Sequence, residues 1–151
     1  MLPVHPPIAL PDADATDALA QRMAGRVGPG DVLLLEGQIG AGKTHFARAL
    51  IRALGVTEDI PSPTFTLVQT YDAGFEIWHA DLYRLSHPDE AQELGLTEAF
   101  ETALCLVEWP EKLGADRPKA ALTLRFSLSG DGRTVALFSD QPGWAARLAD
   151  V

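Results

Sequence analysis

Eight residues, Gly37-Gln38-Ile39-Gly40-Ala41-Gly42-Lys43-Thr44, decide the fold of this chain. They follow the pattern glycine, four residues, glycine, lysine, threonine, which is typical of a loop that cradles phosphates. The glycines permit positive φ angles and let backbone amides approach an anion closely. Lys43 is therefore expected to bridge the β- and γ-phosphates of a nucleoside triphosphate, and the Thr44 hydroxyl to ligate Mg²⁺.

The segments on either side of this loop support the same interpretation. Residues 31–36 contain four consecutive apolar residues, which predicts a strand buried on both faces, as in a parallel sheet. Residues 43–54 carry an apolar stripe at helical spacing, and Gly55 is expected to end that helix. A glycine turn that arose by chance would not need a strand before it and a helix after it.

The remaining pattern predicts an α/β chain with one domain over residues 1–151. We expect a three-layer P-loop NTPase-like fold with a mixed parallel and antiparallel central sheet and flanking helices. Further strands are predicted at residues 8–11 (an edge strand), 65–71, 75–80, 103–107, 121–128 and 134–139. Further helices are predicted at residues 16–27, capped by Asp14 or Thr16, and at 88–94, 97–102 and 142–151.

Composition excludes several functional classes. The formal net charge of −9 repels phosphate backbones, so broad non-specific binding of nucleic acid is not expected. The one cysteine, Cys105, lies in an apolar run, so we expect a buried thiol with no intrachain disulfide and no cysteine-based zinc site. The sequence shows neither an apolar stretch of about 18 residues nor a secretory signal, so we expect no transmembrane helix, no secretion and no membrane partner.

Two carboxylates end predicted strands and are candidates for phosphoryl chemistry. Glu108 follows an apolar strand, where a carboxylate that holds Mg²⁺ is expected beside a phosphate loop. Asp81 follows the strand that contains His79; it would position the attacking water or a metal-bound water, or else cap the next turn. His79 is predicted to be a structural hydrogen-bonding partner, because no second histidine lies at ligand spacing.

Three other features have both a functional and an ordinary interpretation. The proline-stiffened segment from Ser62 to Thr66 is either a switch loop that senses the γ-phosphate or a turn that leads into a strand. Trp109 packs near the nucleotide or covers the edge of the core. Arg133, on a predicted hairpin, reaches a phosphate or the base, or else is solvated.

Five segments together resemble the TsaE (YjeE) family, over nearly the whole chain. They are Gly37–Thr44, Ser62-Pro63-Thr64-Phe65-Thr66-Leu67-Val68, His79-Ala80-Asp81-Leu82-Tyr83-Arg84-Leu85, Glu93-Leu94-Gly95-Leu96 and Leu106-Val107-Glu108-Trp109-Pro110-Glu111. The loop is shared by many families, whereas the second and third segments are far more specific.

The resemblance implies a cytoplasmic ATPase needed for threonylcarbamoyladenosine modification of tRNA. It implies ATP and Mg²⁺ as cofactors, and it implies work with a TsaB–TsaD pair that modifies adenosine 37 of tRNAs reading ANN codons and is reset by ATP hydrolysis. The protein would contact tRNA only indirectly, through that pair. By resemblance, Asp81, Lys43 and Glu108 serve catalysis, and Thr44 and Glu108 hold the metal. The nucleotide would contact Thr16, Gly37, Gly40, Ala41, Gly42, Lys43, Thr44 and Arg133, and the switch loop would present Ser62, Thr64 and Thr66.

Two residues depart from the family pattern, and two other functions stay open. Gln38 stands where aspartate is common, and His45, where a second threonine is frequent, is expected to face away from the site. A small-molecule kinase would need an acceptor pocket and an arginine-rich lid. A non-catalytic module would need only nucleotide binding to drive assembly. No Asn-Lys-x-Asp segment for reading guanine is present, which favours ATP.

Overall fold

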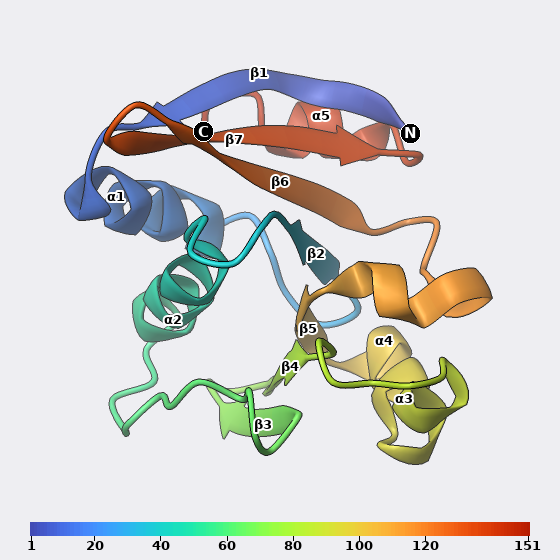
Figure 1. Cartoon of the computed structure of the whole chain (residues 1–151). Coiled ribbons are helices and arrows are strands. Elements are labelled where there is room, and N and C mark those ends of the chain that lie inside the picture. The colour runs from blue at the N-terminus through green and yellow to red at the C-terminus, as the bar shows by residue number, and fades with distance from the viewer.

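The computed structural model describes residues 1–151 and contains a seven-stranded sheet with helices against both faces (Figure 1). The strands are β1 (Leu2–Leu10), β2 (Val32–Glu36), β3 (Val68–Asp72), β4 (Glu76–Asp81), β5 (Leu104–Glu108), β6 (Leu122–Ser129) and β7 (Gly132–Ser139). The helices are α1 (Ala13–Ala24), α2 (Lys43–Ala53), α3 (Asp89–Glu93), α4 (Leu96–Thr102) and α5 (Gly143–Arg147), and η1 (Pro110–Asp116) is a 3₁₀ segment.

The strand order β1-β7-β6-β2-β5-β4-β3 places β2 in the middle of the sheet. β2 is parallel to β5 and to β6, and β4 is parallel to β5. The hairpins β3–β4 and β6–β7 and the edge pair β1–β7 are antiparallel. The predicted mixed sheet is confirmed, and its parallel centre brings the carboxyl ends of β2, β4 and β5 to the same edge.

The strands of the centre are buried on both faces, as their apolar runs predicted. Leu33 and Leu35 of β2 join the core under α1 and α2, while Val32 and Leu34 join the core under α3 and α4. Figure 1 shows the two pairs of helices on opposite sides of the sheet. The result is the predicted three-layer arrangement. No helix is both long and apolar enough to cross a bilayer.

Several predicted boundaries were wrong, each for a local reason. The N-cap of α1 is Asp12, whose Oδ1 accepts a hydrogen bond from the Ala15 amide at 2.9 Å. The predicted caps, Asp14 and Thr16, both lie within the helix, and Thr16 is buried. β3 begins at Val68 rather than Phe65, because the Leu67 amide donates to the Pro63 carbonyl and closes a turn over residues 63–66. β1 extends back to Leu2 despite its prolines, which an edge strand tolerates where its register shifts. α5 is shorter than predicted, and η1 was not predicted at all.

Candidate functional site

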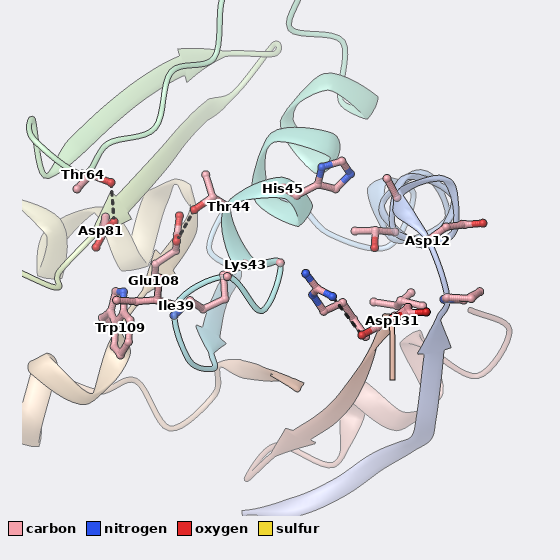
Figure 2. Close-up of a pocket in the computed structure, with 18 of the residues that line it drawn as sticks. Asp12, Ile39, Lys43, Thr44, His45, Thr64, Asp81, Glu108, Trp109 and Asp131 are labelled. Atoms are coloured by element: carbon pink, nitrogen blue, oxygen red, sulfur yellow. Dashed lines mark hydrogen bonds between the residues drawn. The ribbon is translucent and has the colours of Figure 1, made fainter. Parts of the chain in front are cut away.

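A cavity of about 640 Å³ opens where the loop Gly37–Thr44 joins β2 to α2. Its size falls in the range of small-molecule sites in proteins. The wall contains loop residues, the carboxyl ends of β4 and β5, the β1–α1 junction and the β6–β7 turn (Figure 2). Because these segments are far apart in the sequence, only the sheet topology brings them together.

The glycines of the loop adopt conformations that other residues rarely reach. Gly42, which precedes α2, has a φ angle of 106°. Gly37 has a φ angle of 140°, and a Cβ there would lie 2.6 Å from the Phe126 carbonyl oxygen of β6. Gly37 is therefore required both by its backbone conformation and by the close approach of a neighbouring strand. The predicted phosphate cradle has the strand, turn and helix that its mechanism needs.

The Lys43 side chain is folded inward over the loop. It is 5% exposed, and its ammonium donates to the Gly37 carbonyl. Its Nζ also lies 3.5 Å from the centroid of the Trp109 ring, which lines the cavity and also packs against the core under α3 and α4. Burial lowers the pKa of Lys43 from its ordinary value, although the charges of Glu108, Glu111 and Asp81 oppose that change. Lys43 must therefore break its hydrogen bond to the Gly37 carbonyl before its ammonium can donate to a phosphate.

Thr44 and Glu108 face each other across the floor of the cavity. The Thr44 hydroxyl donates to Glu108 Oε1 at 2.7 Å. On the other side of the carboxylate, Glu108 Oε2 lies 2.7 Å from Nε2 of the buried His79. The hydroxyl and the carboxylate predicted to hold a metal therefore lie in direct contact, and His79 is a hydrogen-bonding partner as predicted.

Asp81 ends β4 beside Glu108 of β5, its partner in the strand register. Its Oδ1 accepts the Tyr83 amide at 3.0 Å, and its Oδ2 accepts the Thr64 hydroxyl at 3.3 Å. The hydroxyls of Ser62 and Thr64 are 2.8 Å apart. The segment from Ser62 to Thr66 is therefore tied to a carboxylate of the site through Thr64.

The opposite side of the cavity is made by elements from the two ends of the chain. Figure 2 shows Asp12 and Asp131 on this side, across the loop from Thr64, Asp81 and Trp109. Arg133 lines the wall here and donates through Nη1 to the Gly132 carbonyl at 3.2 Å. Both sides carry carboxylates: Asp81 and Glu108 end neighbouring strands on one side, and Asp12 and Asp131 accompany the Arg133 cation on the other.

Most of the predicted site residues lie on the cavity wall, although nothing in the geometry assigns their roles. Those on the wall are Thr16, Gly40, Gly42, Lys43, Thr44, Thr64, Asp81, Glu108 and Arg133. Gly37, Ala41, Ser62 and Thr66 do not line it; Ala41 is fully buried, and Thr66 accepts from the Gln69 side chain instead.

His45 lies on the cavity wall, so the expectation that it faces away was wrong. Its Nε2 is 2.8 Å from Asp17 Oδ1, a contact that links α2 to α1. Tyr83, Asp12, Ile39 and Asp131 also line the cavity and were not predicted. Ile39 and Tyr83 carried a signal in the sequence, since Ile39 belongs to the glycine-rich loop and Tyr83 follows Asp81 by two residues. Asp12 and Asp131 depend on how the two ends of the chain fold over the loop.

The mixed sheet and the loop that joins β2 to α2 define an α/β protein with a P-loop NTPase-like fold. The model of the family described as threonylcarbamoyl adenosine biosynthesis protein TsaE matches residues 10–135. The chain therefore belongs to the TsaE family.

Individual relatives agree with this assignment. The tRNA threonylcarbamoyladenosine biosynthesis protein TsaE of Bacillus subtilis (strain 168) is 38% identical over 128 residues, which cover 83% of this chain and 80% of the relative. The protein of the same name from Rickettsia bellii is 37% identical over 130 residues, which cover 85% and 90%. The crystal structure of Bacillus subtilis YdiB superposes with a TM-score of 0.78 at 27% identity, covering 95% of this chain and 91% of that one.

Proposed function

We propose that this protein is a Mg²⁺-dependent ATPase that acts in the biosynthesis of threonylcarbamoyladenosine in tRNA. Membership of the TsaE family and the names of its relatives support the pathway. The observation that carries the chemistry is the meeting of Lys43, Thr44, Glu108 and Asp81 on one cavity wall. A cation, a hydroxyl and two carboxylates at the mouth of a phosphate loop are the groups that phosphoryl transfer from a nucleotide requires.

The donor set fits Mg²⁺. The Thr44 hydroxyl and Glu108 Oε1 are adjacent hard oxygen atoms, which this ion prefers. The chain holds no group of three or more His, Cys, Asp or Glu side chains placed to bind a metal by themselves. This agrees with an ion that takes most of its ligands from nucleotide phosphates and water, as Mg²⁺ commonly does. When bound, the ion would neutralise charge on the β- and γ-phosphates.

The residues of the chain would act as follows. Lys43 leaves the Gly37 carbonyl and donates to phosphate oxygens, while the loop amides hold the remaining charge. Asp81 accepts a hydrogen bond from a water molecule and aims it at the γ-phosphorus. The water oxygen bonds to that phosphorus, the bond to the β–γ bridging oxygen breaks, and ADP, phosphate and a proton leave.

We further propose that turnover depends on a TsaB–TsaD pair in the cytoplasm, and that tRNA is met only through that pair. Arg133, next to Asp131 on the β6–β7 turn, is the arginine on the cavity wall, and its Nη1 donates to the Gly132 carbonyl of its own hairpin. A chain without an arginine at the γ-phosphate is expected to be slow alone, because such a cation contributes several orders of magnitude. The net charge of −9 also disfavours direct contact with tRNA.

The test is ATP hydrolysis measured with and without the TsaB–TsaD pair. The pair should stimulate the wild type, and Asp81→Asn should abolish that stimulation while ATP affinity stays within about threefold, since Asp81 acts on water. Asp59→Asn changes an exposed carboxylate outside the cavity and serves as the control. Equal hydrolysis with and without the pair would contradict the proposal. Transfer of the phosphoryl group to a metabolite would show a kinase instead.

A further inference from the structure

His79 is the one fully buried histidine of the chain, and it does not line the cavity. It lies two residues before Asp81 on β4, so both side chains point to the same face of the sheet. In the parallel register Asp81 pairs with Glu108 of β5, which places His79 directly behind the Glu108 carboxylate. The imidazole and the carboxylate are 0% and 2% exposed.

The contact between these two groups fixes the second oxygen of the Glu108 carboxylate. Its Oε2 lies 2.7 Å from His79 Nε2, while its Oε1 accepts from the Thr44 hydroxyl at the same distance. Each carboxylate oxygen thus has one protein partner, and the carboxylate cannot rotate without breaking both bonds. Because the imidazole is fully buried, water cannot take its place at Oε2 in the wild-type protein.

The partners of the imidazole define which nitrogen carries its proton. An ionised carboxylate only accepts hydrogen bonds, so Nε2 must be the donor. Nδ1 is buried and has no hydrogen-bond partner in the structure. Glu108 is therefore the only hydrogen-bond partner of the imidazole, as expected for a side chain that orients one neighbouring group.

We propose that His79 is a positioning residue that orients Glu108 for the Mg²⁺ ion, and that it sets the affinity for the metal without touching the nucleotide. This inference rests on the proposed Mg²⁺-dependent function. Partners that lie behind a metal ligand typically change metal affinity roughly 10- to 100-fold when they are removed.

A matched pair of variants separates orientation from mere packing. The side-chain nitrogen of glutamine reaches as far as Nε2 of histidine, whereas that of asparagine reaches only as far as Nδ1. His79→Gln can therefore keep the bond to Glu108, and His79→Asn cannot. The probe is Mn²⁺, titrated by electron paramagnetic resonance into protein saturated with a non-hydrolysable ATP analogue, with Mg²⁺ as the competitor.

We expect His79→Asn to weaken metal affinity roughly 10- to 100-fold and His79→Gln to stay within about threefold of the wild type. Affinity for the nucleotide in EDTA should be equal in all three proteins. Equal metal affinity of the two variants would overturn the inference, and so would an equal loss of metal-free nucleotide binding, which would indicate a structural role.

A second measurement needs no variant and applies even if His79→Asn does not fold. The ¹⁵N resonances of His79 in the wild type should show a protonated Nε2 and an unprotonated Nδ1, and they should move when Mg²⁺ joins the nucleotide complex. A proton on Nδ1, or no movement, would overturn the inference. The two proposals fail separately: loss of partner-stimulated hydrolysis in the wild type, with the difference between Gln and Asn retained, would remove only the ATPase.

Discussion

The Lys43 ammonium lies 3.5 Å from the centroid of the Trp109 ring, so the cation expected to meet the phosphates rests against an aromatic face. Trp109 has a φ angle of 60°, which a residue with a side chain rarely adopts. Such backbone strain costs on the order of 1–3 kcal/mol and gathers at functional sites. This backbone conformation turns the Trp109 ring at the end of β5 back over the loop. There its centroid also lies 4.9 Å from the centroid of the Tyr83 ring.

This contact predicts a fluorescence signal for nucleotide binding. When phosphates draw Lys43 away, Trp109 loses a cation over its ring, and its emission should change. Trp109→Phe should remove most of the change caused by ATP, and Trp78→Phe, which alters a tryptophan outside the cavity, should retain it. A nucleotide-dependent change that survives in Trp109→Phe would contradict the assignment.

Two glycines of the loop should respond differently to alanine. At Gly37 a Cβ would meet the Phe126 carbonyl, whereas at Gly40, with a φ angle of 83°, nothing lies within 4 Å. Urea unfolding should show Gly37→Ala to be less stable than Gly40→Ala by about 1–3 kcal/mol, because a clash is added to the backbone strain. Gly40→Ala should instead lose nucleotide affinity, since Gly40 lines the cavity. Equal stability of the two variants would show that β6 can move away from Gly37.

Glu36, directly before the loop, should make stability depend on acid. Burial raises its pKa, but hydrogen bonds and charges from Arg117 and Arg125 outweigh burial and hold the pKa below its ordinary value. A lowered pKa means that this stabilisation is present above the unfolded pKa and is lost as the pH falls through the folded one. Glu36→Gln should lower the free energy of unfolding by about 1–2 kcal/mol at pH 7, and by less near pH 3. A cost that does not change with pH would exclude an ionic origin.

Cys105 should not react while the chain is folded. It is fully buried, and burial raises the pKa of its thiol to about 12. At pH 8 the folded protein therefore has almost no thiolate, whereas the thiol of the unfolded chain has a pKa of about 8.5. Mass spectrometry after iodoacetamide should find no label under native conditions and full label in urea. Rapid native labelling would mean that β5 opens to solvent.

The same raised pKa fixes the sign of a further effect. The protonated thiol of Cys105 stabilises the fold below about pH 8.5, and this contribution is lost as the pH rises toward 12. Cys105→Ala should therefore flatten the alkaline part of the curve of stability against pH. Near pH 7 the change in the free energy of unfolding caused by Cys105→Ala should come from lost packing alone.

The central layer of the fold could be predicted because its signals are local. Four apolar residues before the loop, and the run that ends at Glu108, have no polar side chain to turn toward water, so both strands had to be buried on two faces. The start of β3 at Val68, rather than at the predicted Phe65, could not be predicted in this way. The alternating residues from Phe65 onward match a strand, and only the bond from the Leu67 amide to Pro63 shows otherwise.

The sequence by itself determined that the segment from Gly37 to Thr44 is a glycine-rich loop between a strand and a helix, because glycine spacing and apolar periodicity act within a few residues. Only the tertiary structure decided what surrounds that loop. Parallel pairing of β2, β5 and β4 placed Glu108, Asp81 and His79 at one edge of the sheet, and the order β1-β7-β6 placed Arg133 opposite them. These neighbours are set by hydrogen bonds between strands far apart in the chain, which no local pattern specifies.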